Sequence, residues 1–143
     1  AGTVPVRHLL PYWKTSNRYL FSGGSVNMRD AAVYAKEENW SKAVELWKQT
    51  YETKKGKQKM YAAYNTALGY EMQDSIDTAL EWALKAQTLA REKSKTDKKE
   101  TGEIHNGTIS YYIFISMYVD ELEKRKEGMA RLNMQMNRFD DDF

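Results

Sequence analysis

Few residues of this 143-residue chain could carry out catalysis or bind a metal, and those few are scattered. Cysteine is absent, which excludes disulfides and thiol catalysis. The two histidines, His8 and His105, lie far apart and lack partners at the short spacings that zinc sites use. Asp74 with Asp77, and the aspartates at 140–142, are carboxylate clusters expected in a turn and in a tail, whereas acid–base catalysis needs carboxylates fixed beside a cleft. We therefore expect no enzyme, no metal and no cofactor.

Composition points to one folded domain, because 41% of the residues are apolar and the length matches a single core. With 22 basic and 20 acidic residues, the net charge of +2 gives no reason to expect a polyanion partner. We interpret the lysine-rich stretch 54–59 as a solvated loop and expect no nucleic acid. The longest nearly apolar run, residues 109–119, is well below the roughly 20 residues that a membrane-spanning helix needs.

The order of elements follows from glycine, proline and the spacing of apolar residues. Residues 1–26 hold both prolines, the pair Gly23-Gly24 and several aromatics, which indicates an extended lead-in with a short strand near residues 19–21. From residue 27 onward, apolar residues recur at helical spacing. We predict one helix from the cap Asn27 to Glu38, a second from the cap Asn39 to the loop at 54–57, and further helices over 58–73, 76–93 and 103–127. The last continues to 137, and residues 139–143 form a disordered tail.

An internal repeat appears when the chain is shifted by 36 residues. The shift aligns Ala31 with Ala67, Tyr34 with Tyr70 and Ala43 with Ala79. Small side chains at the crossing of two helices let their axes approach to roughly 8–10 Å, so the alanines predict two helical hairpins that share one packing plan.

This pattern resembles the tetratricopeptide repeat, a helix–turn–helix unit with a small residue and a tyrosine in its first helix and an alanine in its second. The matching residues are the stretch 65–70 with Ile76 and Ala79, and Ala31, Tyr34 and Ala43 with residues 38–40. The turn glycine of the family is replaced by Glu38 and Asp74. The resemblance implies an all-α domain over 27–138, with hairpins 27–56 and 57–93 and a capping helix 103–137.

A second resemblance rests on the order of Leu10-Pro11-Tyr12-Trp13, Arg18-Tyr19 and Asn39-Trp40-Ser41-Lys42-Ala43. These segments are similar to the C-terminal region of uncharacterised lipoproteins from Bacteroidetes. That likeness implies an exported protein at the cell envelope and a longer parent protein, with an N-terminal domain and a lipidated cysteine. The opening Ala1 fits this expectation of a processed or partial chain.

Function is expected where the tetratricopeptide resemblance implies a concave, peptide-binding groove. Aromatic rings and methionines bury a peptide's side chains while an amide pairs with its backbone. In the other reading, residues 1–25 or the fifth helix cover this face, and the domain is purely structural. The residues that map to the groove are Met28, Ala32, Tyr61, Tyr64, Asn65, Leu68 and Met72.

Two further interaction sites are open from the sequence. The stretch from Tyr111 to Val119 is apolar nearly all round, so two sides of it must be covered. The cover is either the fourth helix with residues 1–25, or a second copy in a homodimer through helix 103–127. The alternative function is glycan binding by aromatics that stack on sugar rings, and a Trp13→Ala variant would separate it from peptide binding. The aromatics concerned are Tyr12, Trp13, Tyr19 and Trp82.

Overall fold

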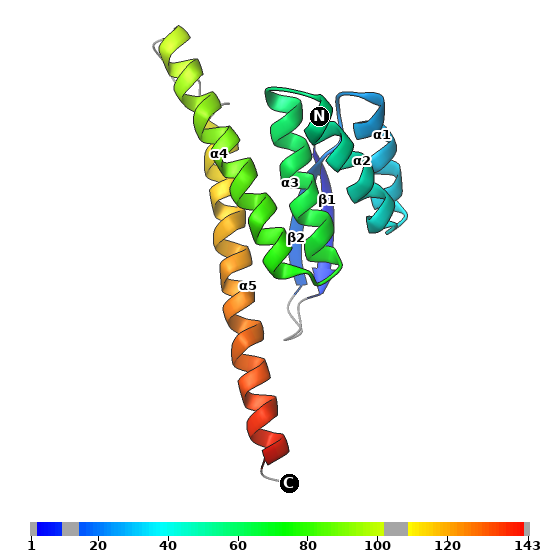
Figure 1. Ribbon diagram of the computed structural model, residues 1–143, viewed down its shortest axis with the longest axis vertical. Coiled ribbons are helices and arrows are strands. Elements are labelled where there is room, and N and C mark those ends of the chain that lie inside the picture. The colour runs from blue at the N-terminus through cyan, green and yellow to red at the C-terminus, as the bar shows by residue number, and fades with distance from the viewer. Residues whose placement is uncertain (1–2, 10–14, 102–108, 142–143) are drawn as a thin grey trace.

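The computed structural model describes residues 3–9, 15–101 and 109–141, and within these it contains five helices and an N-terminal β-hairpin (Figure 1). Strands β1 (Thr3–Leu9) and β2 (Thr15–Phe21) pair antiparallel, with Thr3 opposite Phe21. The predicted helical body is confirmed, and β2 includes the expected short strand, whereas β1 was not predicted. The helices are α1 (Val26–Lys36), α2 (Trp40–Thr53), α3 (Lys57–Met72), α4 (Ile76–Thr101) and α5 (Ile109–Asp141).

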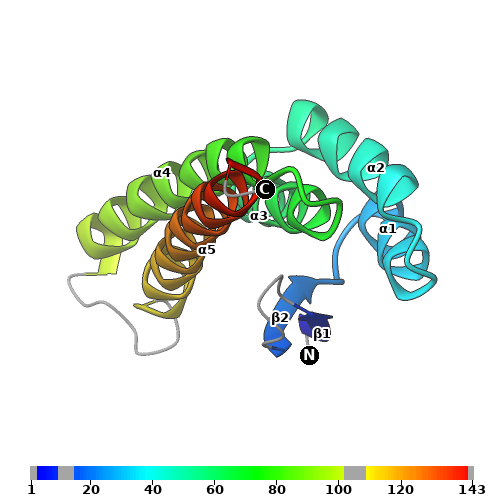
Figure 2. The same ribbon diagram turned by 90° about the horizontal axis from the view of Figure 1, so that it is seen from below.

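The helices form a curved layer, as Figure 2 shows. Helices α1, α3 and α5 lie on the inner side of the curve, α2 and α4 lie on the outer side, and the β-hairpin sits within the concave side. Each helix packs against the next one along the chain, and β2 is the strand that contacts α3 and α1. The sequential packing leaves one concave face, and the hairpin is placed against it.

The predicted repeat determines how the helices pack. The four alanines at 31, 43, 67 and 79 are all completely buried, as the close approach of paired helices requires. The turns repeat as well, because Glu38 and Asp74 both adopt a φ of 61°. Past the first turn Asn39 N donates to Tyr34 O at 2.8 Å, and past the second Ser75 N donates to Tyr70 O at 2.9 Å. Both hairpins therefore close with the same left-handed helix end.

Gly69 sets how closely α2 approaches α3. A Cβ atom built at Gly69 would overlap Val44 Cγ2 and lie 3.3 Å from Trp47 Cζ3. Both contacting side chains belong to α2 and are buried. A larger residue at position 69 would therefore force the two hairpins apart.

Several predicted helix boundaries are wrong. Helix α1 is capped by Ser25, whose hydroxyl accepts from Met28 N at 3.4 Å, while the predicted cap Asn27 donates to the side chain of Gln49. Helix α4 continues to Thr101 because the polar stretch after residue 93 has no glycine or proline before position 102. Helix α5 reaches Asp141, so the expected disordered tail is helical at least that far.

Candidate functional site

The concave face of α3 holds the backbone of β2. Phe21 N donates to Asn65 Oδ1 at 2.9 Å, and Asn65 Nδ2 donates to Phe21 O at 2.7 Å, both inside the protein. The Tyr64 hydroxyl donates to Tyr19 O, two residues earlier on β2. In an antiparallel pair alternate residues direct their N–H and C=O to the same side, so β2 faces β1 with one edge and α3 with the other. Side chains of α3 thus form the hydrogen bonds to this edge of β2 that a third strand would otherwise form.

An aromatic cluster surrounds the ring of Phe21. The ring stacks on Tyr61 with centroids 4.2 Å apart and meets Tyr64 edge-on at 5.2 Å. From α5, the rings of Tyr111 and Phe114 lie 6.1 and 6.2 Å away. The hydroxyls of Tyr61 and Tyr111 are 2.7 Å apart, and burial together with this hydrogen bond raises the pKa of Tyr61. The cluster joins β2, α3 and α5.

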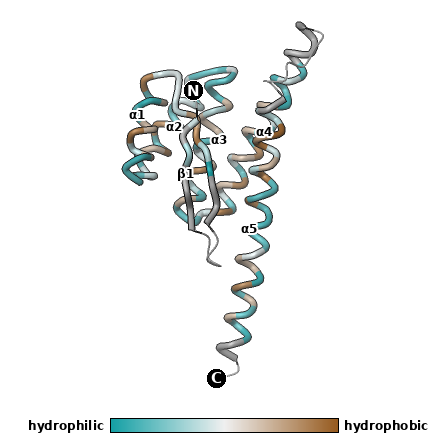
Figure 3. The backbone as a smooth tube through the Cα atoms, turned by 180° about the vertical axis from the view of Figure 1, so that it is seen from behind, coloured by the Kyte–Doolittle hydropathy of each residue, from teal (hydrophilic) through white to brown (hydrophobic). Residues whose placement is uncertain are grey.

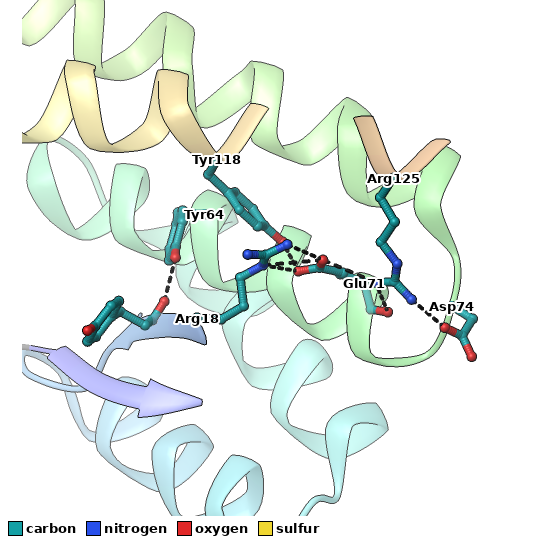
Figure 4. Close-up of polar contacts among 7 residues, drawn as sticks. Arg18, Tyr64, Glu71, Asp74, Tyr118 and Arg125 are labelled. Atoms are coloured by element: carbon teal, nitrogen blue, oxygen red, sulfur yellow. Dashed lines mark hydrogen bonds and ion pairs between the residues drawn. The ribbon is translucent and has the colours of Figure 1, made fainter. Parts of the chain in front are cut away.

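A buried ionic cluster lies beside the aromatic one and is centred on Glu71 (Figure 4). Arg18 of β2 donates from Nε to Glu71 Oε1 and from Nη2 to Oε2, each at 3.0 Å. Tyr118 of α5 donates its hydroxyl to Oε1 at 2.9 Å. Arg125, also of α5, donates to Oε2 at 3.1 Å and to Asp74 at 2.7 Å. Glu71 and Arg125 are 0% and 1% exposed, so β2, α3 and α5 meet at one buried carboxylate.

The charges of this cluster balance. Burial alone would raise the pKa of Glu71, but the hydrogen bonds and charge of Arg18, with Tyr118 and Arg125, outweigh burial and lower it. Burial works against the charge of Arg18 too, and the bonds and charge of Glu71 outweigh it and raise the pKa of Arg18. Burial and the charge of Glu71 raise the pKa of Tyr118, which stays protonated and donates. A carboxylate held ionised by two guanidinium groups is poorly suited to act as a general acid near neutral pH.

The predicted groove residues meet the chain's own strand. Tyr61, Tyr64 and Asn65 come together beneath β2 and bind it. The other predicted residues do not reach solvent as an open groove would require: Met28 and Leu68 are completely buried in the core, while Met72 and Ala32 are half-buried against it. Residues 18–21 therefore occupy the part of the concave face where a peptide was expected.

Of the predicted sugar-stacking residues, the structure places only Tyr19 and Trp82, and these two lie on different sides of the helical layer. Tyr12 and Trp13 lie outside the described residues. Tyr19 is 43% exposed on β2, within the concave side. Trp82 lies on α4 on the outer side, edge-on to Tyr51 at 5.0 Å, with Lys85 Nζ 4.1 Å from its ring centroid.

The apolar stretch of α5 is covered by its own chain. Ile115 and Leu122 are completely buried, and Gln87 of α4 donates to Ser116 at 3.1 Å. On the other side Tyr111 and Phe114 pack against Phe21, as described above. The cover is thus the intramolecular alternative, α4 with residues of the lead-in, and it leaves Ile113 and Met117 exposed.

Among the described residues, three pockets open along β2. Two are small, about 150 Å³ beside Tyr19 and Met117 and about 210 Å³ beside Thr3 and Phe114. The third, about 420 Å³ beside Lys57 and Tyr111, reaches the size range of small-molecule sites. Aromatic residues make up most of the lining of the two small pockets, and none of the three places two carboxylates face to face.

The histidines and the aspartates 74 and 77, for which the sequence indicates no catalytic or metal-binding role, lie as follows. His8 lies in β1, and His105 is outside the described residues. Asp74 pairs with Arg125, and Asp77 pairs with Lys126 at 2.9 Å. Across residues 3–9, 15–101 and 109–141, no group of three or more His, Asp or Glu side chains is placed to hold a metal ion. Within the same residues, no helix is both long and apolar enough to cross a membrane.

The ionic cluster was not predicted from the sequence. Its signal was the position of charged residues on otherwise apolar helix faces: Glu71 lies four residues after Ala67, and Arg125 lies three after Leu122. A charge at a buried position indicates a buried partner. The partner itself, Arg18, could not be identified from spacing, because it is 53 residues from Glu71.

Comparison with known proteins gives one match. No curated protein and no solved structure is similar to this chain at a significant level. A family model matches residues 29–124, more than half of the chain, and its description is a domain of unknown function, DUF6340. This match identifies neither a tetratricopeptide family nor a lipoprotein family. The matched range begins in α1 and ends in α5, so it covers both hairpins, Glu71 and Tyr118, and the chain belongs to the DUF6340 family.

Proposed function

We propose that this chain is a non-catalytic interaction module of the tetratricopeptide type whose concave face binds an extended segment, and that the segment is its own β2. In this proposal the module joins the hairpin, and any domain attached to it, to the helices within a larger protein. The observation that carries the proposal is the amide of Asn65, which both accepts from and donates to the backbone of Phe21.

The repeat geometry supports the tetratricopeptide part of the proposal. The left-handed residues Glu38 and Asp74 occupy the positions where the family has its turn glycine, and the buried alanines recur at the same offset. The inner helices α1 and α3 also line the concave side, as the first helices of such repeats would (Figure 2).

The contacts to β2 combine backbone recognition with side-chain selection. Asn65 and Tyr64 bind backbone groups, which any extended segment could offer. The side chains add selectivity, because Arg18 meets the buried carboxylate of Glu71 and Phe21 fills the aromatic cluster. The face therefore suits an extended segment with an arginine three residues before a phenylalanine.

The ionic contact favours permanent occupation of this face. Breaking a buried ion pair by removing one partner costs about 3–5 kcal/mol, while a whole domain is stable by about 5–15 kcal/mol. Displacement of β2 would separate Arg18 from Glu71 and expose Leu20, which is 1% exposed. We therefore infer that β2 stays in place and that the domain serves a structural role in its parent protein.

A second candidate, an exchangeable peptide groove, is favoured by the Asn65 contact because backbone pairing is independent of sequence. In that case a partner's segment displaces β2, so β2 must open while the helices stay folded. Native-state opening of this kind has a lower free energy than global unfolding.

Amide hydrogen exchange on the full chain distinguishes the two. The amide of Phe21, bonded to Asn65, reports on β2, and the amide of Ala67 in the buried part of α3 reports on the helices. A structural domain requires both amides to exchange with the same free energy. A free energy for Phe21 that is lower by several kcal/mol would contradict this role and support the exchangeable groove.

A labelled peptide with the sequence of residues 15–22 provides the second measurement. The structural role predicts that it does not bind to the full chain. Saturable binding that is abolished when the peptide carries Phe21→Ala would instead assign peptide capture to this face. The substituted peptide is the matched control, since it keeps the backbone that Asn65 binds.

A further inference from the structure

The C-terminal part of α5 carries apolar side chains that nothing in the described structure covers. Figure 1 shows this part of α5 projecting beyond the other helices, and Figure 3 shows hydrophobic positions along it. Leu132, Met134 and Met136 are 36%, 63% and 58% exposed. Leu132 and Met136 are four residues apart and share one face of the helix, whereas Met134 lies on another face. Large apolar side chains that gather on one exposed face mark an interaction site.

The exposed residues continue the buried face of the same helix. Upstream, Ile115, Tyr118, Leu122 and Arg125 are buried at alternating spacings of three and four residues. The same spacing continues at Met129, Leu132 and Met136, and in the sequence at position 139. This is the alternation by which two helices pack along a shared seam. The fully buried part of this face ends at Arg125; beyond it Met129 is half-buried, and Leu132 and Met136 are exposed.

The free part of α5 has little to stabilise it alone. Isolated helices shorter than about 12–15 residues are marginal in water, and a glycine inside a helix costs about 1 kcal/mol relative to alanine. The projecting part starts near Gly128 and ends with α5 at Asp141. This part continues α5 and needs no nucleus of its own, but a further helix packed against it would stabilise it.

We propose that this further helix is the same segment of a second copy, packed antiparallel. The spacing is self-complementary: when two copies cross at residue 134, Leu132 lies opposite Met136 of the other copy, and Met129 lies opposite position 139. The same pairing occurs on both sides of the crossing, as a twofold-symmetric interface requires.

The fold of each copy excludes the parallel arrangement. Upstream of Gly128, the seam is covered by the copy's own α3 and the turn after it, because Arg125 bonds Glu71 and Asp74. If two copies packed their α5 helices parallel through this face, α3 and the following turn of one copy would overlap with those of the other copy. Antiparallel packing places these parts of the two copies at opposite ends of the paired segment.

Charge favours the same arrangement. The sequence has three successive aspartates at 140–142, of which the first two end α5. Parallel packing would bring together the two helix ends that carry Asp140 and Asp141, whereas antiparallel packing separates them. The interface has only about four layers, which places it in the small class, below roughly 1,200 Å² in total, that is weak and reversible.

Sedimentation velocity of the full chain, from about 1 µM to about 1 mM, covers the dissociation constants expected for so small an interface. The expected result is a rise from the monomer mass of 16.7 kDa toward twice that value. Leu132→Glu should weaken dimerisation at least about tenfold, since it introduces two charges into the seam. The matched control is Met134→Glu, which alters a more exposed apolar residue off the seam and should leave dimerisation unchanged.

The orientation is tested by single cysteines, because the chain has none of its own. A mixture of Leu132→Cys and Met136→Cys chains should form disulfides between the two variants in preference to disulfides within either one. A monomer at every concentration, equal effects of Leu132→Glu and Met134→Glu, or preferential disulfides between two Leu132→Cys chains would each overturn the proposal.

Discussion

Glu71 is the residue whose substitution tests the structure most directly. It is 0% exposed and accepts hydrogen bonds from Arg18, Tyr118 and Arg125. Glu71→Gln keeps the size of the side chain and one acceptor oxygen, but it removes the charge. Both guanidinium groups then lose their buried counterion, although Arg125 keeps its bond to Asp74, whose side chain is 68% exposed.

The expected loss of stability follows from this geometry. Removing one partner of a buried ion pair costs about 3–5 kcal/mol, because the remaining charge stays buried and uncompensated. For a chain of this length each kcal/mol lowers the melting temperature by roughly 3–5 °C, so we expect Glu71→Gln to melt about 10–25 °C lower.

Urea unfolding followed by circular dichroism measures the free energy of unfolding. Glu81→Gln is the matched control, since Glu81 is an exposed glutamate on α4 and its loss should change stability by less than about 0.5 kcal/mol. Adding Arg18→Met to Glu71→Gln should cost less than Arg18→Met costs alone, because the two residues interact. A loss below about 1 kcal/mol for Glu71→Gln, or strictly additive effects, would refute the buried ionic cluster.

Three further predictions follow from local features. Because folding lowers the pKa of Glu71, its contribution to stability is present above the unfolded pKa of about 4.3 and is lost as pH falls through the folded pKa. The difference in unfolding free energy between the wild type and Glu71→Gln should therefore shrink steadily below about pH 4. A difference that stays constant with pH would contradict the lowered pKa. Gly69→Ala should destabilise the protein by about 1–3 kcal/mol, since its Cβ would overlap Val44, and a neutral effect in urea unfolding would mean that α2 and α3 are less closely packed. Glu38→Gly should stabilise by about 0.5–1 kcal/mol because the φ of 61° suits glycine. The matched substitution Glu37→Gly, at a φ of −85°, should destabilise, so equal signs in thermal melts would contradict the left-handed turn.

The helices were predictable because their signals are local. Apolar residues three and four positions apart lie on one helix face wherever the helix sits, and caps such as Asn39 act within a single turn. The repeat was predictable for the same reason, since Ala31 and Ala67 serve equivalent helix crossings. Where local signals were weak, as after residue 93 or before residue 27, the predicted boundaries were wrong.

The occupant of the concave face could not be predicted in this way. Asn65, Tyr64 and Tyr61 were identified as groove residues from their face of the helix. What they bind is Phe21 and its neighbours, and Phe21 is 44 residues from Asn65, with the whole of the first hairpin between them. A strand offers the same backbone groups to any partner, so its sequence does not say which helix it will meet.

The sequence by itself determined a helical-repeat body, the small residues that let its helices approach, and the side chains that line its inner face. The tertiary structure alone decided that β2 fills this face and that Arg18 and Arg125 share Glu71. It also decided that Leu132 and Met136, near the C-terminal end of α5, stay exposed. The physical reason is range: helix formation depends on residues within a turn or two, whereas the neutralisation of a buried charge depends on how distant segments are brought together.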